Sequence, residues 1–205
     1  MLNEIRAKLD QLRGLDVAYS IFGSEKHRYS LNPPLTEARV AEIEGTLGMR
    51  LPEQYREYVV EFADGGAGPY YGVTPLAAAS KWSGEYIEYL KRPFVAPTRA
   101  AEAQLGRHAP GSLLVCNMGC GSDGNLIITG TERGYVWIQS PDCGWSPELV
   151  SEAHFPRGCD IDGAMDAGIA SPASLKLQFL DWYNKWLDDS LKRIMAKSSR
   201  PEHSS

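Results

Sequence analysis

Several features that would identify a membrane, secreted or nucleic-acid-binding protein are missing from this chain of 205 residues. No stretch is apolar for long enough to cross a bilayer, and charged residues interrupt the first segment, MLNEIRAKLDQLRGLD, every few positions. Lysine and arginine form no cluster, and the formal net charge is −5, which argues against binding to nucleic acid through its phosphates. We therefore expect a cytoplasmic protein with neither nucleic-acid nor membrane partners.

Cysteine and histidine are also scarce, with four of each. The cysteines are Cys116, Cys120, Cys143 and Cys159. Their spacing lacks the closely spaced ligand pairs of a structural zinc site, and in a cytoplasmic protein we expect reduced thiols. No histidine lies within a few residues of another, so we expect no metal and no cofactor. A nucleophile pair of Cys120 or Cys143 with His154 stays open as an alternative.

The composition is that of a globular protein, 43% hydrophobic and 23% charged, and apolar residues at helical spacing mark several helices. We expect an N-terminal helix over residues 2–13. Thr36 is a suitable N-cap for a helix that Gly48 ends, and Pro52 suits the first position of the next helix. A long amphipathic helix over residues 172–196 closes the chain, with Ser171 and Pro172 as its cap and first-turn pair.

The strand signal is strongest in three apolar or β-branched runs, at residues 113–116, 125–129 and 135–139. Turns with glycine separate them, which predicts an antiparallel meander. We assign Asp123-Gly124 to a hairpin turn. The predicted fold class is α+β, with an antiparallel or mixed sheet flanked by helices.

The rest of the chain shows fewer regular patterns. We expect an extended connection between the first two helices, and a short strand at residues 70–73. Residues 140–171 are rich in loop-forming residues. One domain should span residues 1–197, with its core at about 20–140, and residues 198–205 should form a disordered tail.

Gly119-Cys120-Gly121-Ser122-Asp123-Gly124 matches the G-x-G-x-x-G expression of dinucleotide-binding loops. That loop must open a helix whose N-terminus meets the pyrophosphate, whereas here another predicted strand follows. The match therefore favours a turn.

Two blocks of motifs share their order and spacing with a known family. The first block contains Val40-x-x-Ile43-Glu44-x-x-Leu47-Gly48, then Leu51-Pro52-x-x-Tyr55-Arg56-x-Tyr58, then Asp64-Gly65-Gly66, and the second contains Gly119-Cys120-Gly121 and Gly134-Tyr135-Val136-Trp137. Together they resemble the SUKH superfamily, which includes a fungal cell-wall regulator and many bacterial immunity proteins. The segments FGSEKHRYSLNPPL (residues 22–35) and GPYYGVTPL (residues 68–76) resemble in particular its larger bacterial branch. The resemblance implies an α+β fold whose motif residues are scaffold, and no shared catalytic residue.

The functional expectation depends on this resemblance. It implies a non-enzymatic immunity protein of a polymorphic toxin system, which binds and occludes a cognate protein toxin. Because the chain is acidic, a basic toxin would complement its charge. The alternatives are a regulatory scaffold in cell-envelope or signalling pathways, and an enzyme with a Cys/His site.

We expect the partner surface on loops at one end of the sheet, where exposed aromatic side chains could anchor a protein. The predicted partner-binding residues are Tyr70, Tyr71, Asp123, Asp142 and Trp145. We predict no catalytic residue and no metal ligand.

Overall fold

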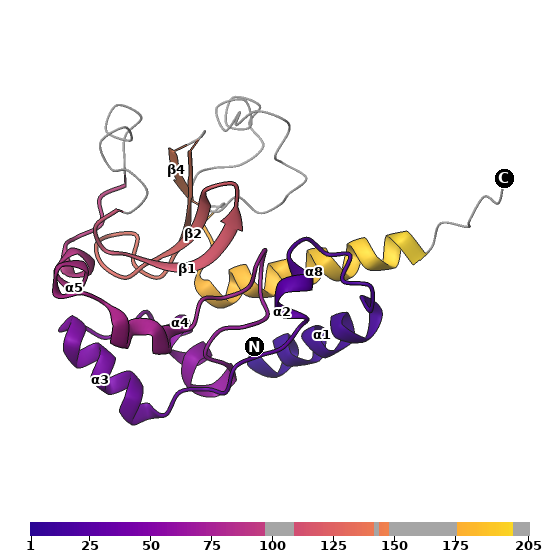
Figure 1. The fold of residues 1–205 in the computed structure, drawn as a ribbon, viewed down its shortest axis with the longest axis horizontal. Helices are drawn as coiled ribbons and strands as arrows, with labels where there is room; N and C mark the ends of the chain where they lie inside the picture. Colours follow the sequence, from indigo (N-terminus) through magenta and orange to yellow (C-terminus); the bar gives the residue numbers. More distant parts are fainter. Residues whose placement is uncertain (97–108, 142–143, 148–175, 199–205) are drawn as a thin grey trace.

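The computed structural model describes residues 1–96, 109–141, 144–147 and 176–198, and Figure 1 shows a twisted sheet lying against a layer of helices. The helices are α1 (Leu2–Leu15), α2 (Ser24–His27), α3 (Glu37–Leu47), α4 (Glu53–Glu57), η1 (Tyr58–Phe62), η2 (Leu76–Lys81), α5 (Gly84–Lys91) and α8 (Phe179–Ser198). The strands are β1 (Ser112–Gly119), β2 (Ser122–Ile127), β3 (Val136–Ser140) and β4 (Gly144–Pro147). The predicted α+β class is confirmed.

The four strands form one antiparallel sheet in the order β1-β2-β3-β4. β1 contains the predicted run 113–116, and β2 and β3 overlap the runs 125–129 and 135–139. The described strands form the expected meander, with every pair antiparallel. The fourth, β4, was not predicted, because it is short and lies inside the loop-rich region that begins at residue 140.

The assignment of Asp123-Gly124 to a hairpin turn was wrong. Gly119 pairs with Ser122, so the β1–β2 turn consists of Cys120 and Gly121, whose φ angles are 50° and 80°. Positive φ at both central residues defines the type I′ turn that suits the twist of a hairpin. The G-x-G-x-x-G match therefore spans a turn and the start of β2, and no helix follows it.

Helix α3 begins and ends where the sequence predicts. The Thr36 side chain accepts a hydrogen bond from the Arg39 backbone N–H at 3.2 Å, and Gly48 ends the helix in the left-handed conformation with φ 67°. Pro52 precedes the first residue of α4 as its N-cap.

Two segments differ from their predictions near the first helices. The connection after α1 contains the single helical turn α2, which Gly23 and Arg28 bound in left-handed conformations. Residues 70–73 form no strand. Val73 only makes isolated bridges to Gly66 and Cys116, because the chain reverses direction at Gly72, where φ is 95°.

The core lies between the sheet, α4–η1 and α8, which runs beside α1 (Figure 1). The ring centroid of Phe179 lies 4.7 Å from that of Tyr55 and 4.9 Å from that of Tyr58. Helix α8 begins at Phe179 and not at residue 172, since Gln178 still has extended backbone bridged to Tyr135. The remaining core side chains of the helical layer include Ile5, Leu9, Leu12, Phe62, Tyr183 and Leu187.

Candidate functional site

A buried carboxylate organises the connection between α1 and α2. Asp16 is 2% exposed and accepts hydrogen bonds from the backbone N–H of Ser20 at 2.7 Å and of Ile21 at 3.1 Å. It also accepts a bond from the Tyr29 hydroxyl at 2.5 Å. Burial alone would raise the pKa of Asp16, but these hydrogen bonds to the charged form outweigh it and lower the pKa. The ionised carboxylate thus holds the connection in one conformation.

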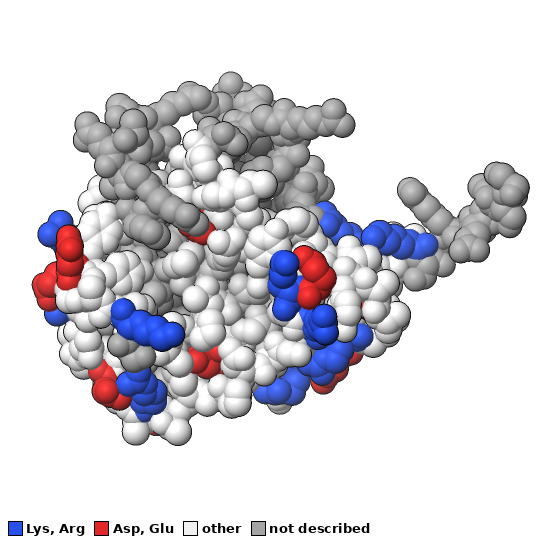
Figure 2. Space-filling model, in the orientation of Figure 1, with Lys and Arg blue, Asp and Glu red and all other residues white. Residues whose placement is uncertain are grey.

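Asp16 fixes the backbone of the connection, and several apolar side chains at and beside it are exposed to solvent. Val17 is 76% exposed, Phe22 51% and Leu15 46%, and Tyr19 is exposed as well. Figure 2 shows a largely uncharged area in the middle of the face that it draws, with Lys, Arg, Asp and Glu side chains along its borders. Exposed apolar side chains grouped in this way are typical of an interaction site.

Phe22 joins a second loop to form what we call the aromatic cluster, consisting of Phe22, Tyr70 and Tyr71. The Phe22 ring centroid lies 6.2 Å from that of Tyr70 and 5.4 Å from that of Tyr71. Gly23 makes this approach possible, because a Cβ there would lie 1.9 Å from the Tyr70 carbonyl oxygen. Gly23 also has φ 81°, which only glycine adopts easily.

The β1–β2 turn borders the aromatic cluster. The Tyr71 backbone N–H donates to the Asn117 carbonyl oxygen at 3.3 Å, and the Tyr71 ring lies 3.2 Å from the Cβ position of Gly119. Cys120 is exposed at the tip of this turn. Three segments distant in sequence, around residues 22, 70 and 120, therefore meet at one place on the surface.

The structure brings together only part of the predicted partner surface. Tyr70 and Tyr71 are partly exposed and adjacent, whereas Asp123 is fully buried in β2 and Trp145 is 4% exposed. Trp145 packs in a small apolar cluster, with its ring centroid 6.0 Å from that of Phe94. The expectation that Asp123 and Trp145 face a partner is therefore wrong for this conformation, and Asp142 lies outside the described residues.

Phe22 is not among the predicted partner-binding residues, because the sequence predicts only an extended connection for its segment. A signal was present: VAYSIF, residues 17–22, is almost wholly apolar yet fits neither a helical nor a strand period. An apolar run without a period can be core or exposed surface, and only the tertiary position of Asp16 decides between them.

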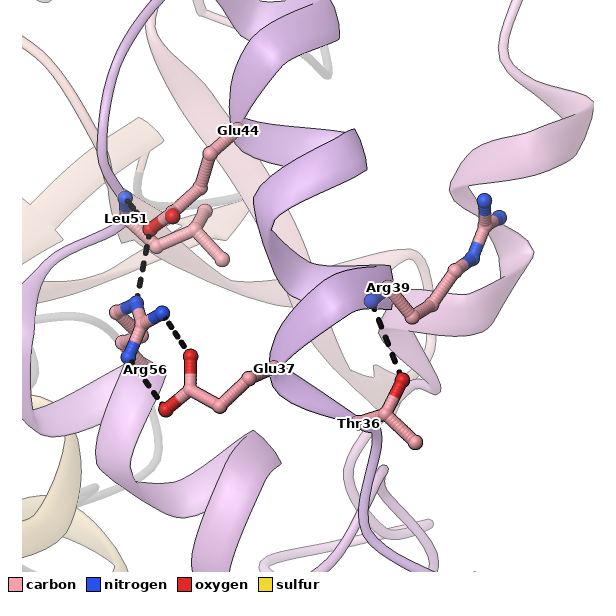
Figure 3. Close-up of polar contacts among 6 residues, drawn as sticks. All are labelled: Thr36, Glu37, Arg39, Glu44, Leu51 and Arg56. Atoms are coloured by element: carbon pink, nitrogen blue, oxygen red, sulfur yellow. Dashed lines mark hydrogen bonds and ion pairs between the residues drawn. The ribbon is translucent and has the colours of Figure 1, made fainter.

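A charged network on the other side of the helical layer fixes the α3–α4 turn (Figure 3). The Arg56 guanidinium donates to both carboxylate oxygens of Glu37 and to Glu44 Oε1, the latter at 3.2 Å. Glu44 Oε1 also accepts the Leu51 backbone N–H at 2.9 Å. The bond from Arg56 lowers the pKa of Glu37, although that carboxylate is exposed.

A pocket of about 510 Å³ opens beside this network. Its lining consists of Leu51 with three arginines and three glutamates, namely Arg50, Arg56, Arg133, Glu53, Glu57 and Glu61. Charges of both signs in equal number, with no nucleophile among them, give no indication of catalysis.

The described part of the chain does not bring together a Cys/His catalytic pair. Cys116 is buried and its thiol donates to the Pro69 carbonyl oxygen at 3.1 Å. His27 accepts the Tyr29 backbone N–H at Nδ1 at 3.0 Å, and burial lowers its pKa to about 4, so the imidazole is neutral at pH 7. Among these residues no group of His, Cys, Asp and Glu could hold a metal ion. His154 and Cys143 lie outside them.

A comparison of the chain with protein-family models, curated proteins and solved structures found no match. None of the described helices is both long and apolar enough to cross a membrane.

Proposed function

We propose that the protein is a non-enzymatic binding module that neutralises a cognate bacterial toxin by covering it. The observation that carries the binding part is the aromatic cluster, with Phe22 half exposed and held against Tyr70 and Tyr71. Tyrosine and other rigid aromatic side chains supply large contact areas at low entropic cost and are enriched among residues that dominate binding energy. The β1–β2 turn, whose tip is exposed, borders these side chains and forms part of the same surface.

The toxin part of the proposal is supported by the resemblance to SUKH immunity proteins alone. Its motif residues serve the scaffold in this structure, as the resemblance implies: Gly48 ends a helix, Pro52 precedes one, and Gly65 and Gly66 adopt positive φ angles of 77° and 99°. The aromatic cluster lies in the two segments, residues 22–35 and 68–76, that resemble the larger bacterial branch, and none of its side chains belongs to the scaffold motifs just named. Binding specificity would therefore reside in loops that those motifs hold in place.

Co-expression with the product of the neighbouring gene tests this function. If the product is toxic, we expect this protein to restore growth and to co-purify with the toxin as a stable complex. The double variant Phe22→Ser, Tyr71→Ser should weaken both effects, while Val95→Ser, an exposed apolar site elsewhere, should not. Loss of growth rescue with a fully folded double variant supports the aromatic cluster. A stable complex unaffected by the double variant, or no complex at all, contradicts the proposal.

A further inference from the structure

The exposed apolar side chains are concentrated in one segment. Seven large apolar side chains are exposed among the described residues, and four of them, Leu15, Val17, Tyr19 and Phe22, follow one another at the end of α1 and in the connection to α2. The others are Met1, Val95 and Met195. This concentration distinguishes the segment from the scattered apolar residues that any protein surface carries.

One face of α8 lies along the same segment. Trp186 contacts His27 of α2 with a centroid distance of 6.0 Å, and Lys197 Nζ lies 3.4 Å from Ser20 Oγ. Residues 186, 190, 193 and 197 share a helix face because they are three or four positions apart. Arg193, which is exposed, therefore lies between these two contacts.

The charges around the segment are mainly positive, although the whole chain carries −5. Lys26 and Arg28 are exposed on either side of His27, and Arg193 and Lys197 add two cations from α8. The only exposed acid from Asp16 to Tyr29 is Glu25, since Asp16 is buried. Figure 2 shows several Lys and Arg side chains, with fewer Asp and Glu among them, where Figure 1 places α1, α2 and the end of α8.

Three of these cations could pair with acidic groups of a partner. Lys26, Arg28 and Lys197 make no ion pair with any residue of the described ranges, in contrast to Arg56, which two glutamates neutralise. A partner that binds the exposed apolar side chains must also meet these cations. We name the set the basic apolar surface, and it comprises Val17, Tyr19, Phe22, Lys26, Arg28, Arg193 and Lys197.

We propose that the basic apolar surface binds a protein partner whose contact surface is acidic around an apolar centre. An apolar centre bordered by charge is the usual anatomy of a protein interface, and charges of opposite sign accelerate association and set orientation. The inference rests on the proposed binding function, but it changes the expected charge of the partner. The net charge of −5 suggests a basic partner, whereas the positive charge around the exposed apolar residues requires an acidic one. A protein partner is favoured over lipid because Phe22 is packed against two tyrosines and not extended outward.

Nuclear magnetic resonance of the labelled full chain tests this proposal with defined probes. The probes are a short peptide of alternating Glu and Leu, its Lys and Leu counterpart, and vesicles of phosphatidylserine and phosphatidylcholine. We expect the Glu–Leu peptide alone to shift the amide signals of Val17, Phe22 and Lys197. Equal shifts with the Lys–Leu peptide, shifts located elsewhere, or vesicle binding that depends on Val17 would overturn the proposal.

Matched variants separate the apolar from the electrostatic contribution. Val17→Asp should abolish the shifts, and Val95→Asp, at a site of equal exposure (74% against 76%), should leave them unchanged. Lys26→Glu with Lys197→Glu should slow association about tenfold at low salt, an effect that high salt removes. Arg50→Glu with Lys81→Glu changes the net charge equally at exposed sites outside the surface. Equal slowing by both pairs would overturn the proposal.

These outcomes are distinguishable from failure of the proposed function. If the Glu–Leu peptide maps to the surface but no toxin is neutralised, the surface stands and the toxin proposal fails. If a toxin complex forms and tolerates both Val17→Asp and the Lys26, Lys197 double reversal, the binding function stands and this surface fails.

Discussion

Acidification below pH 6.5 should destabilise the protein through His27. The imidazole packs against Tyr29 and Trp186, with centroid distances of 5.3 and 6.0 Å, and its Nδ1 accepts a backbone N–H. Burial lowers its pKa from 6.5 to about 4, although the Gly68 backbone and Glu25 favour the charged form. Between these two pH values the unfolded chain binds a proton at this site and the folded chain does not.

The sign and the size follow from this difference. A histidine with a lowered pKa leaves stability intact above pH 6.5, and stability falls as the pH decreases from 6.5 toward 4. From pH 7 to pH 5 the full shift corresponds to about 2 kcal/mol of unfolding free energy. Because water reaches part of the ring, we expect about 1 kcal/mol.

Urea denaturation of the wild type and of His27→Gln at a series of pH values measures this contribution. Glutamine can still accept the Tyr29 N–H but cannot titrate. The variant should be less stable at pH 7, because it loses the ring contacts, and should show a flatter profile between pH 7 and pH 5. Parallel profiles for the two proteins across that range would refute the assignment to His27.

Four further substitutions test the packing, two glycine positions and the cap of α3. Tyr58→Phe should leave the free energy of unfolding unchanged or raise it by up to about 1 kcal/mol, because the buried Tyr58 hydroxyl has no hydrogen-bond partner among the described residues. Gly23→Ala should cost more than about 2 kcal/mol through its clash with the Tyr70 carbonyl, whereas Gly14→Ala, with nothing within 4 Å, should gain about 0.5 to 1 kcal/mol. Thr36→Ala should cost about 1 kcal/mol by removing the α3 cap. Chemical denaturation measures all of these, and a stable Gly23→Ala protein with unchanged near-ultraviolet dichroism would contradict the clash.

Sequence reasoning succeeded where the determining interactions are local. Helix α3 lies between a Thr36 cap and a Gly48 terminator, and both signals act within one turn of the helix ends. Helix α8 shows the limit of such signals. Its predicted start at residue 172 relied on a nearby cap, while the structure supplies Gln54 Oε1, which accepts the Leu180 backbone N–H at 2.8 Å from 126 positions away.

The turn between β1 and β2 shows how register overrides a local motif. Asp-Gly is a strong turn signal, yet Gly124 lies inside β2 opposite Cys116. A Cβ at Gly124 would lie 3.2 Å from the Cβ of Cys116 and 3.9 Å from the Trp182 ring. Glycine is used here because a side chain would crowd Cys116 on the neighbouring strand β1, a requirement that only the tertiary structure reveals.

The distribution of charge explains how an acidic chain can present a basic surface. From Glu37 to Glu61 the chain contains six glutamates and three arginines, so α3, α4 and η1 carry much of the negative charge. The cations of the basic apolar surface come from α2 and α8, which are far apart in the sequence. Where acidic and basic side chains lie on separate elements in this way, an acidic partner is attracted to the basic ones. The partner that we propose is therefore opposite in charge to the one that the net charge suggests, because association depends on the charge at the contact surface and not on the sum over the chain.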